Sequence, residues 1–176
     1  IALWEDTVQK SPDKARGHFQ LGLAYYDARR YDRAVAEYQR SARLKAPTYD
    51  LYIDWALSLN ASGRYDEALE KLHEAEKLDR TAHVFTQYAM VYGSQRKWAE
   101  ANAALDQAEK LDPNFAWTYV YRGKVHIGMN QPAAAIADYQ RALQLDPTLQ
   151  EAREDMTVAT RMLRQQAIEW LELTTP

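Results

Sequence analysis

Apolar and small residues recur every three or four positions along most of the chain, which is the spacing of residues that share one face of an α-helix. Between Phe19 and Ser41 this pattern forms two successive stretches, one ending near Tyr26 and the next beginning near Ala34. Polar residues separate the two stretches. The sequence therefore predicts two consecutive helices joined by a short turn.

The helix pair recurs along the chain at a nearly constant interval. Alanines of the second helix are 34, 33 and 34 residues apart, at Ala34, Ala68, Ala101 and Ala135. The same interval relates small residues of the first helix, at Gly22, Ala56, Ala89 and Gly123. A fixed period of this length is the signature of stacked structural repeats, so we expect four copies of one helix pair.

Residues that end helices stand at the turns and joints of the repeat. The turn from Asn60 to Arg64 contains Asn and Gly, which readily take the left-handed backbone conformation found at helix ends. Pro113 and Pro147 follow the third and fourth copies, where proline disfavours helical geometry in the residue before it. The sequence thus places helix boundaries both within and between the copies.

This arrangement resembles the tetratricopeptide repeat, which consists of two antiparallel helices with small residues at their crossing point and a closing proline. The resemblance covers residues 15–148, with departures at Ser41, where the other copies have alanine, and at Arg80, where proline is usual. It implies an all-α fold, namely a right-handed superhelical solenoid of antiparallel helix pairs with a long C-terminal capping helix.

The same register predicts the boundaries of the repeats. We expect 1–14 to be the end of a preceding repeat helix, followed by repeats at 15–48, 49–81, 82–115 and 116–148 and by a capping helix and tail at 149–176. Stacked repeats leave an apolar face at each end, and the amphipathic stripe from Leu149 to Trp170 suits a helix that covers it. Because the chain opens within a helix and without Met, we expect it to be a piece of a longer protein.

Composition excludes several classes of function. The 176 residues include 22 Lys and Arg against 25 Asp and Glu, and the resulting net charge of −3 argues against a dedicated nucleic-acid binder. The sequence contains no cysteine, which excludes disulfides, a thiolate zinc site and a cysteine nucleophile. No stretch is long and apolar enough for a membrane span, so direct membrane insertion is not expected.

Sequence motifs for catalysis and for cofactor binding are also missing. The four histidines lack the spacing of metal ligands, and the six glycines form no phosphate-binding loop. The carboxylates of the second helices suit a solvated face better than acid–base chemistry. We therefore expect no enzyme activity, no metal and no cofactor.

The first helices of such a solenoid line its concave groove, which is where we expect a protein or peptide partner to bind. Helical spacing assigns these residues to the groove: Arg16, Phe19, Leu23, Tyr26, Ile53, Leu57, Asn60, His83, Thr86, Met90, Trp117, Val120 and Lys124. The groove is apolar and aromatic, and it lacks the Lys, Asn and Arg clamp with which some members of the family hold a C-terminal carboxylate. Packing between successive first helices is the alternative role for each of these residues.

The leading hypothesis is a non-catalytic scaffold or adaptor that binds a protein segment in this groove. Two alternatives stay open: the regulatory or tethering tail of a bacterial multispanning, glycosyltransferase-like membrane protein, suggested by the opening residues 3–12, and a self-assembling repeat domain. The apolar residues Ile168, Trp170 and Leu171 at the chain end would serve homodimerisation or fill the groove of the molecule itself. The compartment stays open, cytoplasmic by default or extracytoplasmic for a membrane-protein tail.

Overall fold

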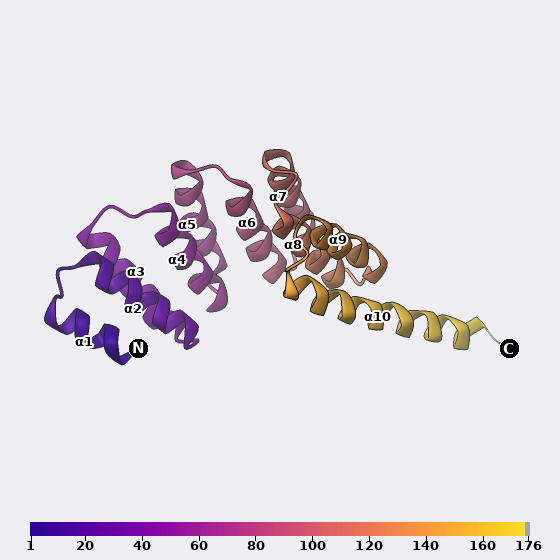
Figure 1. The fold of residues 1–176 in the computed structure, drawn as a ribbon, viewed down its shortest axis with the longest axis horizontal. Helices are drawn as coiled ribbons and strands as arrows, with labels where there is room; N and C mark the ends of the chain where they lie inside the picture. Colours follow the sequence, from indigo (N-terminus) through magenta and orange to yellow (C-terminus); the bar gives the residue numbers. More distant parts are fainter. Residues whose placement is uncertain (175–176) are drawn as a thin grey trace. The chain divides into compact units, whose positions relative to one another are not determined.

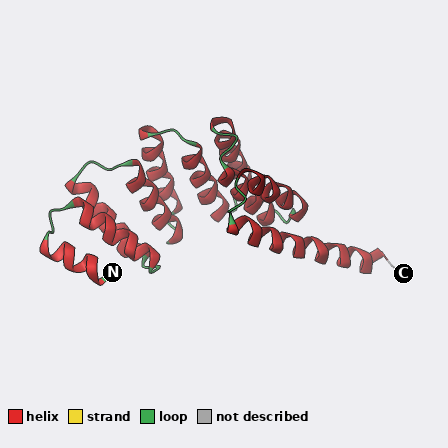
Figure 2. Cartoon of the chain, viewed as in Figure 1, coloured by secondary structure: helices red, strands yellow, loops and turns green. Residues whose placement is uncertain are grey.

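The computed structural model describes residues 1–174, and over that range it contains ten α-helices and no strand (Figures 1 and 2). The chain divides into two compact units, Ile1–Arg80 (unit 1) and the residues from Thr81 onwards (unit 2). The all-α fold of helix pairs expected from the sequence is confirmed. Residues 175–176 of the segment 149–176 lie outside the described residues.

Unit 1 consists of a short helix followed by two helix pairs. Its helices are α1 (Ala2–Lys10), α2 (Ala15–Asp27), α3 (Tyr31–Leu44), α4 (Tyr49–Ala61) and α5 (Tyr65–Leu78). The most extensive packing is within the pairs α2–α3 and α4–α5, while α1 packs on α2 and α3 packs on α4. The short connections within each pair make the two helices antiparallel neighbours (Figure 1).

Unit 2 has the same pairs and ends in a longer helix. Its helices are α6 (Ala82–Ser94), α7 (Trp98–Leu111), α8 (Ala116–Gly128), α9 (Pro132–Leu145) and α10 (Gln150–Thr174). Helix α8 packs on both α6 and α7, and α10 packs mainly on α9. The first helices α6 and α8 are therefore neighbours, as are α2 and α4 in unit 1.

The two helices of each repeat meet at a crossing point that holds one small and one large residue. A Cβ atom at Gly22 would lie 2.4 Å from Cε1 of Tyr38, and one at Gly123 would lie 2.5 Å from Cε1 of Tyr139. In the second and third repeats the large residue is leucine and the small residue is alanine. These buried pairs are Ala56 with Leu72 and Ala89 with Leu105. The combined volume is thus kept roughly constant, since tyrosine goes with glycine and leucine with alanine.

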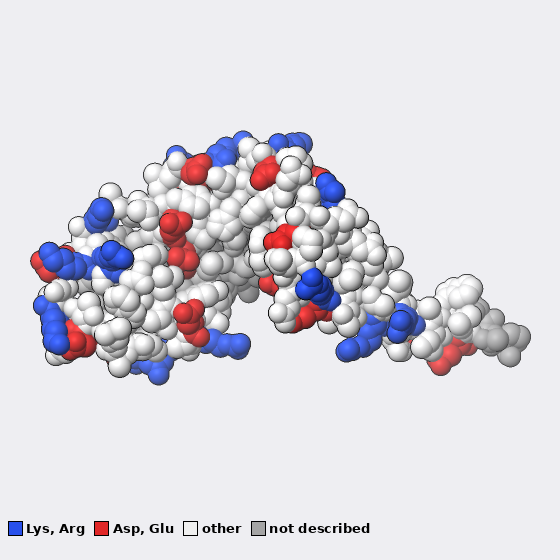
Figure 3. Space-filling model, in the orientation of Figure 1, with Lys and Arg blue, Asp and Glu red and all other residues white. Residues whose placement is uncertain are grey.

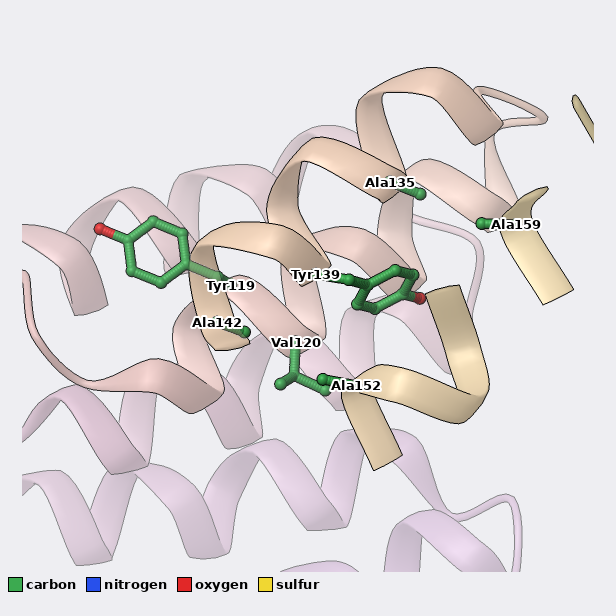
Figure 4. Packing of buried hydrophobic residues seen from close by; sticks show 7 residues of the cluster. All are labelled: Tyr119, Val120, Ala135, Tyr139, Ala142, Ala152 and Ala159. Carbon is green, nitrogen blue, oxygen red and sulfur yellow. The ribbon is translucent and has the colours of Figure 1, made fainter. Parts of the chain in front are cut away.

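The capping helix α10 extends the core of the last repeat. Tyr139 points toward α10 in Figure 4, where Ala152 and Ala159 of α10 belong to the same buried cluster as Val120 and Ala135. Both α10 alanines are fully buried, because small side chains let the helix approach α9 closely. Beyond Ala159 the apolar side chains of α10 become increasingly exposed.

The turns within the repeats close in one common way. The residues Arg29, Gly63, Arg96 and Asn130 all have positive φ, between 57° and 77°. In the first turn the Arg30 N–H donates to the Tyr25 carbonyl oxygen over 2.8 Å, and the other three turns make the equivalent bond. The expectation that Asn or Gly takes this conformation is right for Gly63. In the first and third repeats an arginine takes it instead, because the closing hydrogen bonds outweigh the preference of arginine for negative φ.

The crossing-point geometry predicts the effect of adding one methyl group. We expect Gly123→Ala to lower the free energy of unfolding by about 1–3 kcal/mol, because the new Cβ overlaps the buried Tyr139 ring. Adding Tyr139→Leu should recover part of that loss, since it recreates the combination of Ala89 and Leu105. Chemical denaturation of the four variants of this double-mutant cycle measures the coupling.

Gly93→Ala is the matched control for this substitution. Gly93 is also helical, but a Cβ there would have no atom within 4 Å, so the change should be neutral or stabilising by up to about 1 kcal/mol. Equal effects of Gly93→Ala and Gly123→Ala would contradict the crossing-point account.

Candidate functional site

Two adjoining pockets lie on the first helices of unit 2, and Tyr121 of α8 lines both. The larger, of about 480 Å³, is lined by Ala89, Met90, Gly93, Ser94, Trp98, Tyr121, Lys124, Val125 and Glu151. The second, of about 400 Å³, is lined by His83, Thr86, Gln87, Phe115, Trp117 and Tyr121. Together they make a surface along α6 and α8, which we call the α6–α8 face.

Aromatic side chains form the walls of the α6–α8 face. The rings of Trp117 and Tyr121 lie one helical turn apart on α8, with centroids separated by 6.1 Å. The His83 and Phe115 rings meet edge to face at 6.3 Å. Burial raises the pKa of the Tyr121 hydroxyl, which therefore keeps its proton and remains a hydrogen-bond donor at neutral pH. The face can thus hold bulky apolar side chains beside a hydroxyl donor.

Gln87 supplies a polar group at the base of the second pocket. Its side chain is 5% exposed, and Oε1 has no hydrogen-bond partner in the structure. A buried acceptor without a partner costs about 1–3 kcal/mol. An N–H group of a bound segment would remove that penalty, so this amide favours binding of a hydrogen-bond donor.

The charge of Lys124 at the other end of the face is already balanced. Its Nζ donates a hydrogen bond to Glu151 and lies 3.7 Å from the Asp155 carboxylate, both on α10. Burial opposes the charged form, but the hydrogen bond and the charge of Glu151 raise the pKa of Lys124 above its ordinary value. Lys124 is therefore a poor anchor for a carboxylate, which agrees with the missing clamp in the sequence.

Two residues that the sequence assigned to the groove, Ile53 and Val120, are instead part of the packed interior. Val120 is 0% exposed and packs in the cluster that contains Tyr139, and Ile53 is 4% exposed. The assignment was wrong for these two residues because the first helices also contact one another, and helical spacing alone does not reveal that contact. Thr86 lines the second pocket, although it is 0% exposed and its hydroxyl donates to the His83 carbonyl oxygen of its own helix.

The other assigned residues retain some exposure. In unit 2 these are His83, Met90, Trp117 and Lys124, all on the α6–α8 face. In unit 1, Arg16 is exposed, and Phe19, Leu23, Tyr26, Leu57 and Asn60 are half-buried. The Phe19 ring leans on Tyr38 at 6.0 Å and the Tyr26 ring on Tyr31 at 5.6 Å, so both also contribute to packing.

The structure adds Gln87, Phe115 and Tyr121 to the residues expected from the sequence. One signal for Tyr121 was present, because Trp117 and Tyr121 are spaced to share a helix face. Phe115 precedes α8 and lies outside the helical periodicity, so no pattern pointed to it.

A group of carboxylates lies on the first helices of unit 1. Asp54 of α4 is half-buried, and burial together with the charges of Asp50 and Asp27 raises the pKa of its carboxyl from 3.8 to about 6. None of the three forms an ion pair within the described residues. Acidic side chains gather over this part of unit 1 in Figure 3. The carboxylates repel one another without a cation to balance them.

The buried histidine of unit 1 has a structural role. His18 Nδ1 lies 2.6 Å from Oε2 of Glu37, and Nε2 lies 2.9 Å from the carbonyl oxygen of Pro12. The Pro12 oxygen accepts only, so Nε2 carries a proton. These bonds tie α2 to α3 and to the segment before α2. Among residues 1–174 no group of three or more His, Asp or Glu side chains is placed to hold a metal ion, and no helix has the length and apolar character of a membrane span.

The stacked helix pairs, with a small and a large residue at each crossing, place the chain among the helical-repeat proteins. The sequence profile of the tetratricopeptide repeat matches it twice, at residues 1–48 and 116–149. The chain is a tetratricopeptide repeat protein.

Several known proteins with a related sequence or fold are longer than this chain, which spans only part of their length. The chain is 29% identical over 89 residues to the Hsp70-Hsp90 organizing protein of Triticum aestivum. The aligned residues make up 50% of this chain but only 15% of that protein. Its fold is similar to a chain of the APC/C hetero-tetramer Cut9-Hcn1, with a TM-score of 0.77, 20% identity, and coverage of 92% of this chain and 33% of the other.

A smaller solved structure is also similar. It is the first tetratricopeptide repeat domain of Spaghetti (RPAP3) bound to the HSP90 peptide SRMEEVD, with a TM-score of 0.57 and 22% identity. The likeness covers 68% of this chain and 96% of that one.

The carboxylates of unit 1 predict how stability depends on pH. The folded-state pKa of Asp54, about 6, lies above the ordinary 3.8, so the unfolded chain loses this proton at lower pH. Ionisation of Asp54 therefore destabilises the fold progressively as pH rises from about 4 to 6, and the effect levels off above the folded-state pKa. We expect Asp54→Asn to raise the free energy of unfolding by about 1–2 kcal/mol at pH 7.5 and to leave it unchanged near pH 3.5.

Denaturant titrations at the two pH values measure this difference. Asp66→Asn, on the exposed side of α5, should show no such pH dependence. A stabilisation by Asp54→Asn that is equal at both pH values would contradict the predicted pKa.

Proposed function

We propose that the chain is a non-catalytic protein-interaction module that binds a peptide or protein segment on the α6–α8 face. The observation that carries the proposal is the pair of adjoining pockets that share Tyr121 and have aromatic walls. Pockets of this size each accommodate one large side chain of an extended segment. The unpaired Oε1 of Gln87 would accept a hydrogen bond from the main chain of that segment.

The preferred segment is apolar rather than acidic. The RPAP3 domain holds a peptide that ends in acidic and apolar residues, and its fold is similar to that of this chain. Here the ammonium of Lys124 is engaged by Glu151 and Asp155, which leaves little positive charge on the α6–α8 face to attract a carboxylate. We infer a partner whose bulky aliphatic or aromatic side chains supply most of the binding energy.

A second role, self-association, is favoured by the end of α10. The side chains of Ile168, Trp170 and Leu171 are 50%, 65% and 56% exposed. Such apolar exposure at the end of a long helix is typical of a contact surface. A second copy of the chain would bury these side chains by pairing α10 helices.

Removing an aromatic wall should weaken peptide binding without unfolding the chain. With peptides selected from a displayed random library, Trp117→Ala is expected to raise Kd at least about tenfold, because the indole is half-buried and lines the second pocket. Calorimetric titration gives Kd, and circular dichroism checks the fold. Trp4→Ala is the matched control, since it removes the same half-buried side chain from α1, outside the pockets. Equal binding by the two variants would exclude the α6–α8 face.

Self-association makes a separate prediction. Light scattering over about two orders of magnitude in concentration should show a mass that rises from one chain toward two. Ile168→Gln with Leu171→Gln should hold the mass at one chain, because polar side chains remove the apolar contact while keeping the helix. A mass of one chain at every concentration for the unmodified protein would end this second proposal.

A further inference from the structure

The second half of α10 carries an apolar face that the repeats leave uncovered. The first half packs on α9, with Ala152 and Ala159 in the buried cluster of the last repeat. Leu163, Ala167 and Leu171 follow at intervals of four residues, so they share one side of the helix, and all three are exposed. We call these three residues the α10 face. This half of α10 extends past the other helices of unit 2 in Figure 1, which leaves the α10 face open to a partner.

The contact of this half with the repeats lies on another side of the helix. Gln166 Nε2 donates a hydrogen bond to Oδ1 of Asn130, in the turn between α8 and α9, over 2.9 Å. Successive residues of an α-helix are about 100° apart around its axis, so Gln166 points to the side of the α10 face. A second helix that approaches the α10 face therefore leaves the hydrogen bond to Asn130 intact.

The charges along the same stretch form two blocks of opposite sign. Residues 161–166 contain two Arg and no acidic residue, whereas residues 167–172 contain two Glu and no Lys or Arg. The charged positions are symmetric about the midpoint of 161–172, and so are the large apolar residues Leu163 and Trp170. The symmetric charged positions are Arg161 with Glu172 and Arg164 with Glu169. A copy of this stretch that runs in the opposite direction therefore presents the complementary charge at each charged level.

We propose that α10 pairs with α10 of a second copy of the chain in an antiparallel arrangement, centred between Gln166 and Ala167. The inference rests on the self-association proposed above and specifies its surface and its direction. The Arg block of each copy then lies level with the Glu block of the other, and Leu163 of one copy lies level with Trp170 of the other. Such a pair has twofold symmetry, because both copies use the same α10 face.

A parallel pair is disfavoured by charge and by bulk. It would bring Arg164 level with the same arginine of the second copy and Glu169 level with the same glutamate, and like charges on neighbouring helices repel. It would also place the last repeats of both copies beside each other, because α9 packs on the first half of α10 in each. The antiparallel pair keeps the repeats at opposite ends of the overlap.

Engineered cysteines test the direction of pairing, because the chain has no cysteine of its own. Ala167→Cys and Thr160→Cys place a thiol at two positions one heptad apart on the same side of α10. In the antiparallel pair the two copies of residue 167 are about 1.5 Å apart along the helix axis, and those of residue 160 are about 20 Å apart. A disulfide needs Cα atoms within about 7 Å, so mild oxidation should cross-link Ala167→Cys at least about tenfold more than Thr160→Cys. Non-reducing gel electrophoresis measures the cross-linked fraction.

Charge exchange is an independent test of the same pairing. Arg161→Glu with Arg164→Glu makes the stretch entirely acidic, so the Kd of the dimer should rise at least about tenfold at low salt. Adding Glu169→Arg with Glu172→Arg reverses both blocks and restores their complementarity, so Kd should return to within about threefold of its original value. The fully reversed chain is the matched control, because it contains the same two Arg→Glu changes. Sedimentation equilibrium measures Kd, and circular dichroism checks the helix content.

The outcomes separate this inference from the self-association on which it rests. A mass of one chain at every concentration would overturn both. A dimer in which Thr160→Cys and Ala167→Cys cross-link equally would be parallel and would overturn the inference alone. A dimer that neither cysteine cross-links, or whose Kd is unchanged by Arg161→Glu with Arg164→Glu, would show that the copies meet through another surface.

Discussion

The close contact of two helices at one small and one large side chain is the constraint on which the rest of this structure depends. Each repeat has only two helices and cannot bury its apolar surface unless they approach closely. At Gly22 and Gly123 there is no room for a Cβ atom, because the rings of Tyr38 and Tyr139 fill that space. The same geometry with alanine and leucine in the middle repeats shows that the filled volume is what is kept, and not the residue type.

This packing decides which side chains are left to bind a partner. A first helix contacts its own second helix on one side and a neighbouring first helix on another, so only part of its surface remains accessible. Ile53 and Val120 lie on the sides that pack against neighbouring helices, whereas Trp117 and Tyr121 lie on the accessible side. The accessible sides also hold Oε1 of Gln87, which has no hydrogen-bond partner, and the half-buried carboxyl of Asp54, whose pKa is raised. Stability given up at such positions is commonly associated with binding function.

The helix pairs, their period and the capping helix could be predicted from the sequence, because burial on one helix face imposes a periodic pattern. The orientation of single residues could not. Whether Ile53 or Val120 faces a groove depends on contacts between helices that are separated by about one repeat period, and spacing within one helix carries no such information. The pairing of Lys124 with Glu151 likewise joins two repeat-distant positions. Arg29 takes a left-handed conformation that its own propensity disfavours, because the turn's hydrogen bonds determine it.

The central claim is that the first helices carry most of the binding surface, while the second helices mainly support them. Chemical-shift mapping by NMR tests it most directly, with the isotope-labelled full chain and an unlabelled peptide selected from a displayed random library. The account predicts that the perturbed amide signals cluster on α6 and α8, around Gln87, Trp117 and Tyr121. Perturbations concentrated on the second helices α7 and α9 would contradict it.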